Sequence, residues 1–265
     1  MKFATSAILP AILPAILLLP SLILHFSTIE PFHRGYFCQD TSIKYPYVEQ
    51  QTVPTYLCLV IWILLSVTVF GITFITHKSW KILLNAFYKL LLGFSLCMLI
   101  TNVSKFSLGR LRPHFLTVCN PDLEDVCYQV ENVWDNDTDY YYSEVIQLNY
   151  VEEGNCTGHA NLLKEARLSF VSGHSSISFY MAIFLILFMK KHTSPWILRT
   201  LLQVTYFILA FWISITRIND YMHHPEDVIM GSIIGIVCGF LMHKEGGEVN
   251  VDSPLATTEQ KPLHE

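Results

Sequence analysis

Long apolar runs separated by short polar segments dominate the 265-residue chain. Six runs occur, at about residues 7–26, 54–76, 83–104, 172–189, 197–216 and 228–243. Their lengths lie near the ~20 residues that a helix needs to cross the hydrocarbon core of a bilayer. Because backbone groups in lipid must pair within the segment, each run is predicted to be helical. The pattern therefore predicts an all-α fold, a bundle of six transmembrane helices in a single domain over residues 1–265.

Composition agrees with a membrane protein. Hydrophobic residues make up 52% of the chain and charged residues only 15%, whereas about a quarter of a soluble domain is charged. The mean hydropathy is +0.39. The net charge of −5 says little about partners, because most of the excess acid lies in one segment, residues 114–169; no nucleic-acid partner is expected.

The first run allows two interpretations. Its repeats contain Pro10, Pro14 and Pro20, and a short apolar N-terminal stretch can be a signal peptide. This stretch is longer than a usual signal core, and no clear small-x-small cleavage site follows it. A retained first helix, kinked by its prolines, is the preferred interpretation.

Basic residues predict the orientation. They lie between runs two and three and between runs four and five: His77, Lys78, Lys81, Lys190, Lys191, His192 and Arg199. These loops are therefore predicted to be cytoplasmic, together with a disordered polar tail over residues 244–265. The segments 27–53, 105–171 and 217–227 would face the extracellular space or a lumen. The plasma membrane is the expected location, although an internal membrane fits the same pattern.

The long middle segment carries signs of an outer environment. Asn136 and Asn155 each begin a glycosylation sequon, and both are predicted to be modified. Asn102 begins a third sequon, which is discounted because it lies at a helix end near the bilayer.

The seven cysteines divide between the two environments. Three fall inside apolar runs: Cys58, Cys97 and Cys238. Four lie in outer segments, where oxidation is possible: Cys38, Cys119, Cys127 and Cys156. A local Cys119–Cys127 bridge is plausible, but sequence alone does not determine the pairing. No spacing resembles a zinc site, so no metal is expected.

Three polar clusters interrupt this pattern at the outer ends of the apolar runs. They are Lys105-x6-Arg112-Pro113, Ser172-Gly173-His174 and Arg217-x5-His223-x3-Asp227. Together they supply three cations, a helix start, two histidines and a carboxylate. Charge near a bilayer is costly and is usually functional. The coincidence predicts an active site for a phosphate ester at the extracytoplasmic ends of spans three to six.

The first two clusters each have a simpler interpretation as well. Lys105 and Arg112 are two helical turns apart and are predicted to share one helix face, yet such cations, Arg110 among them, also anchor helix ends. Ser172 is a natural helix cap, and Gly173 would let a ligand approach the N–H groups of the helix start. An ordinary capped helix would have the same sequence.

The third cluster suggests an activated imidazole. His223 and Asp227 are four residues apart, so on a helix they would share a face and could form a hydrogen bond. A carboxylate on one ring nitrogen fixes the tautomer and makes the other nitrogen more nucleophilic. A loop histidine beside an interfacial acid is the simpler alternative, and spacing alone does not choose between His223 and His224.

The ordered set of motifs resembles the type 2 phosphatidic acid phosphatase superfamily, and within it the integral-membrane lipid phosphate phosphatases. Residues 30–38 and 42–47 also resemble that subgroup, and the resemblance runs over about 29–241. Val171 stands where many members have proline, and Thr216 where many have serine. Neither difference removes a charge or a nucleophile.

The resemblance implies a role for each motif residue. His223 would attack phosphorus and form a phosphohistidine, Asp227 would orient it, and His174 would protonate the leaving alkoxide and then activate water. The phosphate would be held by the other motif residues: Lys105, Arg112, Arg217, Ser172 and Gly173. Three fixed cations would replace a metal ion, so no cofactor is expected.

The implied substrates are lipid phosphate monoesters: phosphatidate, lysophosphatidate, sphingosine 1-phosphate and ceramide 1-phosphate. Their hydrolysis would end lipid signals and supply phospholipid metabolism. One alternative is a relative acting on another phosphate ester, such as glucose 6-phosphate, or on an isoprenoid diphosphate. Another is a non-catalytic lipid-binding membrane protein. The sequence chooses neither the preferred lipid nor the oligomeric state, and a homo-oligomer is compatible with it.

Overall fold

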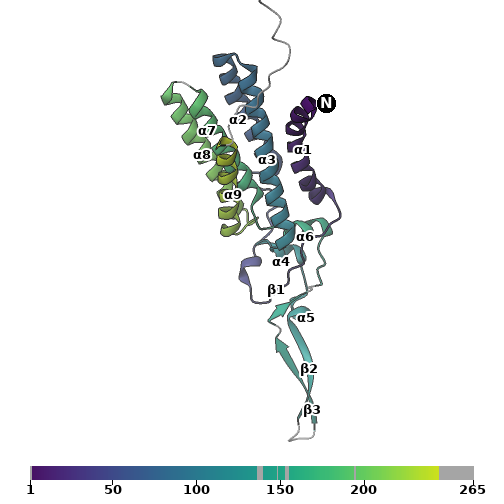
Figure 1. Cartoon of the computed structure of the whole chain (residues 1–265). Coiled ribbons are helices and arrows are strands. Elements are labelled where there is room, and N and C mark those ends of the chain that lie inside the picture. The colour runs from purple at the N-terminus through teal and green to yellow at the C-terminus, as the bar shows by residue number, and fades with distance from the viewer. Residues whose placement is uncertain (1, 136–139, 148, 153–154, 194, 245–265) are drawn as a thin grey trace, which may run out of the picture.

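A bundle of long helices forms most of the protein (Figure 1). The computed structural model describes residues 2–135, 140–147, 149–152, 155–193 and 195–244. Five helices are long and apolar enough to cross a membrane: α2 (Thr55–His77), α3 (Trp80–Leu108), α7 (Gly173–His192), α8 (Trp196–Asn219) and α9 (Pro225–Lys244). These helices confirm the last five apolar runs as candidate spans.

The first run also forms a helix, α1 (Lys2–Phe26), which lies beside α3. Among the residues of α1 whose side chains the structure describes, the apolar stretch Ile12–Leu24 is shorter than the five candidate spans. A sixth crossing by α1 therefore stays a prediction. The predicted disordered tail lies outside the described residues, apart from Lys244 at the end of α9.

Helix α7 is the most buried of the five long helices. In its most apolar window 67% of the residues are buried, against 28–39% in the other four. Helix α9 lies against it through Gly231, Gly235 and Gly239. A Cβ atom on Gly239 would lie only 2.7 Å from the Cγ2 atom of Ile183. Small residues thus let the two helices approach closely, and this contact holds the first turns of α7 and α9 together.

The all-α prediction is wrong for the segment between α3 and α7. Besides the short helices α4 (Phe115–Cys119), α5 (Leu123–Cys127) and α6 (Ala160–Ala166), it contains strands. Strand β2 (Tyr128–Asp135) pairs antiparallel with β3 (Tyr140–Gln147) in a hairpin that extends away from the bundle (Figure 1). A second pair joins β1 (Tyr36–Phe37) to β4 (Tyr150–Val151). Tyrosine and valine favour strands, and both hairpin strands are rich in them.

Two disulfides occur in the segments outside the long helices, one between two segments and one within the segment between α3 and α7, and both differ from the local bridge considered above. Cys38 pairs with Cys127, and Cys119 pairs with Cys156. The Cys119–Cys127 interpretation is wrong because the end of α4 faces the segment around Cys156, where the N–H of Thr157 donates to the Cys119 carbonyl. The other three cysteines, which lie inside the apolar runs, are free and buried.

Helix α3 ends earlier than its charged motif suggests. Gly109 has a positive φ of 51° and its N–H donates to the Lys105 carbonyl, which closes the helix at Leu108. The prediction that Lys105 and Arg112 share a helix face is therefore wrong, because Arg112 lies beyond this turn. Glycine suits the turn because it adopts positive φ without a steric penalty.

Substitution of Gly109 by alanine should lower the thermal unfolding midpoint of the protein in detergent. An L-residue in this conformation costs about 1–2 kcal/mol, and the added Cβ would overlap the carbonyl oxygen of Phe32. Gly71→Ala is the matched control, since nothing lies within 4 Å of that Cβ position and alanine favours a helix. Equal midpoints for the two variants would refute this account of the turn.

Candidate active site

Most of the predicted site residues line one cavity of about 150 Å³. The lining includes members of all three sequence clusters: Lys105, Arg112, Gly173, His174, Arg217 and His223. Ser172 and Asp227 do not line it, and both are fully buried. The structure therefore brings together chain segments separated by more than one hundred residues, with six of the eight predicted residues at the cavity surface.

The helix ends position these side chains. Lys105 lies in the last turn of α3, His174 in the first turn of α7, and Arg217 in the last turn of α8. His223 lies in the short segment between α8 and α9. Alternating helix directions place all these ends at the same end of the bundle, next to the outer segment (Figure 1).

The Arg217 guanidinium is held by its neighbour Thr216 and by two residues outside the three sequence clusters, Gln51 and Asp220. Its Nη1 atom donates to Gln51 Oε1 at 2.9 Å, and its Nη2 atom donates to Asp220 Oδ2 at 2.8 Å. The Thr216 hydroxyl accepts from its Nε and Nη2 atoms at 3.2 and 3.1 Å. Threonine at position 216 therefore supplies a hydroxyl acceptor for the guanidinium, as the serine of many family members would. Asp220 is itself fixed by the N–H and hydroxyl of Thr52.

The His223 imidazole has a defined tautomer. Its Nδ1 atom lies 2.7 Å from the Ser169 carbonyl oxygen, and a carbonyl can only accept, so Nδ1 carries the proton and Nε2 the lone pair. Burial, reinforced by the charges of Arg112 and Lys105, holds the pKa of His223 well below its usual range. The ring is therefore neutral at pH 7, the form in which nitrogen can act as a nucleophile.

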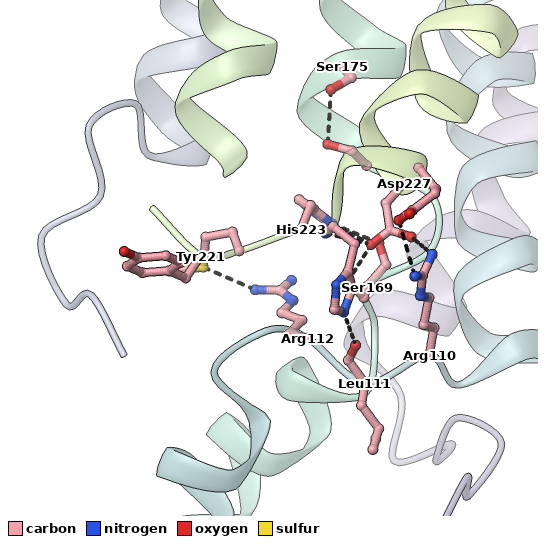
Figure 2. Close-up of polar contacts among 12 residues, drawn as sticks. Arg110, Leu111, Arg112, Ser169, Ser175, Tyr221, His223 and Asp227 are labelled. Carbon is pink, nitrogen blue, oxygen red and sulfur yellow. Dashed lines mark hydrogen bonds and ion pairs between the residues drawn. The ribbon is translucent and has the colours of Figure 1, made fainter. Parts of the chain in front are cut away.

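Asp227 does not make the predicted direct hydrogen bond to His223. The nearest approach, between its Oδ2 atom and Nδ1, is 3.9 Å, too long for a hydrogen bond. Helix α9 begins at Pro225, so His223 precedes the helix and the two side chains do not share a helix face. The carboxylate instead accepts from the Ser169 hydroxyl at 2.6 Å and from the His224 N–H at 3.0 Å (Figure 2).

Arg110 is the third partner of this carboxylate. Its Nη1 atom lies 2.7 Å from Asp227 Oδ1, and its Nη2 atom 3.2 Å from Glu226 Oε2. The interpretation of Arg110 as an interfacial anchor is therefore incomplete, because its charge is directed at the buried carboxylate (Figure 2). His224, the alternative to His223, donates from Nε2 to the Leu111 carbonyl at 3.0 Å and does not line the cavity.

The Ser-Gly-His cluster begins α7 as predicted, although without the expected side-chain cap. Ser172 occupies the N-cap position but makes no capping bond; its hydroxyl accepts from that of Ser175 at 3.1 Å (Figure 2). Its N–H donates to the Asp227 carbonyl at 3.0 Å. Gly173 lies close to Lys105, since a Cβ atom on it would be 3.8 Å from Nζ.

Two nitrogen atoms at the cavity have unmet hydrogen-bonding capacity. Among the described residues, His174 Nε2 and Arg112 Nε are buried without a partner. Buried polar atoms are nearly always paired, so such exceptions commonly mark the place of a ligand or water. The remaining wall includes Glu165 and Gln51, and it is apolar at Leu59, Met98 and Ile177.

The sequons differ in accessibility. Asn155 is exposed, whereas Asn136 lies outside the described residues. Asn102 lines the cavity and donates to the Ser21 hydroxyl at 2.6 Å. This buried contact agrees with discounting Asn102 as an acceptor.

Fold and cavity together define an integral-membrane protein with a cation-rich pocket that contains a neutral histidine. Fixed positive charge of this kind is what phosphoryl transfer requires. Residues 86–247 match the PAP2 superfamily. The chain belongs to this superfamily and is a phosphatase, a phosphoric monoester hydrolase. The matched region contains all three polar clusters, together with Arg110 and Ser169.

Curated relatives agree over most of the chain. Rat (Rattus norvegicus) phospholipid phosphatase 1 is 35% identical over 229 residues, which is 80% of this chain and 74% of the relative. Human (Homo sapiens) phospholipid phosphatase 2 is 32% identical, with 80% and 72% covered. A putative phosphatidate phosphatase of Drosophila melanogaster is 30% identical, with 83% and 63% covered. No solved structure matches the chain.

Proposed function

We propose that the protein removes phosphate from lipid phosphate monoesters through a phosphohistidine at His223, without a metal ion. The observation that carries the proposal is the single cavity in which three cations face two histidines. The names of the relatives, phospholipid phosphatase and putative phosphatidate phosphatase, support lipid phosphates as the substrate class.

In the first step, the Nε2 lone pair of His223 attacks phosphorus. A phosphorus–nitrogen bond forms while the bond from phosphorus to the lipid oxygen breaks. His174 donates a proton to the leaving alkoxide, so the lipid leaves as an alcohol. The neutral, buried His223 ring and the unpartnered Nε2 atom of His174 support these roles.

In the second step, water attacks the phosphohistidine. His174 accepts a proton from the water, the phosphorus–nitrogen bond breaks, and inorganic phosphate is released. The same histidine thus acts as acid and then as base, which returns the enzyme to its starting protonation state.

Lys105, Arg112 and Arg217 would hold the non-bridging phosphate oxygens, together with the N–H of Gly173 at the start of α7. Fixed cations around an in-line displacement supply the charge stabilisation that Mg²⁺ gives in other phosphoryl-transfer enzymes. Ser172, which is buried and does not line the cavity, would support this phosphate cradle indirectly.

The mixed lining of the cavity favours a lipid over a soluble phosphate ester. Apolar side chains from three helices, Leu59, Met98 and Ile177, lie beside the cationic end. A phosphate head can therefore meet charge while its tail meets apolar surface. Phosphatidate, lysophosphatidate, sphingosine 1-phosphate and ceramide 1-phosphate fit this description. Their hydrolysis would attenuate lipid signalling.

The outer orientation of the site is also a proposal. Both disulfides lie at the cavity end of the bundle, as expected in an oxidising compartment, and the basic loops lie at the other end. Asn155 should then carry a glycan in cells that glycosylate. An N-glycosidase should increase the electrophoretic mobility of the wild type, and Asn155→Gln should remove one such shift. Identical mobility of the two proteins before treatment would contradict this orientation.

Phosphate release from phosphatidate in detergent micelles with EDTA tests the proposed function. We expect full activity, no gain on adding Mg²⁺, and much weaker release from glucose 6-phosphate or a polyprenyl diphosphate. Activity that disappears in EDTA and returns with Mg²⁺ would contradict the mechanism. Release from glucose 6-phosphate alone would contradict the lipid substrate.

A further inference from the structure

Ser169 connects the two side chains of the third motif, although it belongs to none of the three motifs. Its carbonyl accepts from His223 Nδ1 at 2.7 Å, and its hydroxyl donates to Asp227 Oδ2 at 2.6 Å. Its own N–H donates to the Arg110 carbonyl at 3.0 Å. The residue is fully buried. One serine therefore makes three hydrogen bonds that fix its carbonyl with respect to both side chains (Figure 2).

We infer that Ser169 and Arg110 are positioning residues through which Asp227 acts on His223. The inference rests on the proposed role of His223 as the nucleophile. It replaces a direct carboxylate–imidazole contact with an indirect one through the Ser169 peptide.

The geometry gives this indirect contact a physical basis. When the phosphorus–nitrogen bond forms, positive charge develops on the His223 ring. The carboxylate, 3.9 Å away, attracts that charge at short range in a buried site. The hydrogen bond to the Ser169 carbonyl strengthens at the same moment, because its donor becomes charged. Both effects require the carboxylate and the carbonyl to stay in place.

Arg110 keeps the carboxylate in place. A buried carboxylate without a partner is costly, and Arg110 supplies a charged donor at 2.7 Å. Its Nη2 atom pairs with Glu226, so the guanidinium contacts two neighbouring carboxylates in the first turn of α9. The Arg110 side chain is 30% exposed, so its replacement leaves no large cavity.

Ser169→Ala is the first test, with Ser66→Ala as a matched control. Ser66 is also a buried serine, but its hydroxyl bonds only to the Trp62 carbonyl one turn earlier in α2. With short-chain phosphatidate we expect kcat of Ser169→Ala to fall about 10–100-fold. This is the usual effect of losing a hydrogen-bond partner that orients a reacting group without touching the substrate. KM should change less than about twofold, because no phosphate contact is removed. Ser66→Ala should match the wild type.

The phosphohistidine provides a readout that a purely structural role would not change. After rapid mixing with labelled phosphatidate and quenching in alkali, we expect labelled enzyme to form more slowly in Ser169→Ala, in proportion to its loss of kcat. Wild-type formation kinetics would overturn the inference.

Arg110 supplies a second, independent test should Ser169→Ala fold poorly. Arg110→Gln should lower kcat about 10–100-fold with little change in KM, and Arg110→Lys should recover part of the loss because it keeps the charge. Arg199→Gln, at the opposite end of the bundle, should have no effect. Failure of lysine to improve on glutamine would overturn the role of Arg110.

His223→Ala separates this inference from the proposed function. An inactive His223→Ala protein beside fully active Ser169→Ala and Arg110→Gln proteins would overturn the inference alone. A fully active His223→Ala protein would overturn the proposed function as well.

Discussion

Substitution of His223 by alanine should abolish phosphate release from phosphatidate, with a loss of about 10⁴-fold or more, the scale seen when an enzyme loses its nucleophile or catalytic base. The ring is almost fully buried and lines the cavity, and its depressed pKa keeps it neutral and able to attack. Among the described residues, only His223 places its imidazole against the Ser169 carbonyl, so no other ring can take its place in the variant. The measurement is steady-state release by the folded, detergent-purified variant.

Two other histidines serve as controls for this experiment. His159 is exposed at the start of α6, so His159→Ala should retain wild-type activity. His224 is adjacent to His223 but contacts Leu111, so His224→Ala should lose far less activity than His223→Ala. A result in which His224→Ala is inactive and His223→Ala is active would contradict the assignment of the nucleophile.

Lys105→Ala should lower kcat/KM by about 10²–10³, as expected for loss of one donor to a developing oxyanion. Lys105 lies in the last turn of α3, and Gly173 at the start of α7 comes close to its ammonium group. Removing this ammonium leaves two cations at the cavity, Arg112 and Arg217. Added Mg²⁺ should not restore activity, because the described residues contain no group of three or more His, Cys, Asp or Glu that could hold a metal ion in place of the ammonium.

The control for Lys105→Ala is Lys81→Ala. Lys81 lies in the first turn of the same helix, is exposed and is remote from the cavity. Its loss should leave kcat and KM unchanged. Equal activity of Lys105→Ala and Lys81→Ala would show that Lys105 does not contact the phosphate.

The sequence alone was enough to predict the main architecture. Apolar runs define α2, α3, α7, α8 and α9 because a helix in lipid must satisfy its own backbone groups. Their alternating directions brought the three charged clusters to one end. The resulting cavity contains Lys105, His174 and His223, as the clusters predicted. The catalytic roles of these residues, the single-domain organisation and the sixth span stay predictions.

Other features of the site have no sequence signature. Ser169 acts partly through its carbonyl, which every residue possesses, so residue type does not reveal it. Arg110 looked like an anchor because its partner, Asp227, is 117 residues away. Gly109 ends α3 before Arg112, which periodicity alone could not show. The Cys38–Cys127 bridge, over a separation of 89 residues, depends on tertiary contacts that local spacing does not predict.

The hydrogen bond between Arg217 and Gln51, which are 166 residues apart, has a consequence for biosynthesis. Contacts between such distant residues require a large loop to close and therefore form late in folding. Lys105 and His174 are synthesised before Arg217 and His223. A nascent chain that ends before α8 therefore has half of the pocket and lacks the proposed nucleophile. If His223 acts as proposed, hydrolysis can begin only once the last two helices have been inserted, and an incomplete chain is expected to be inert toward the lipids around it.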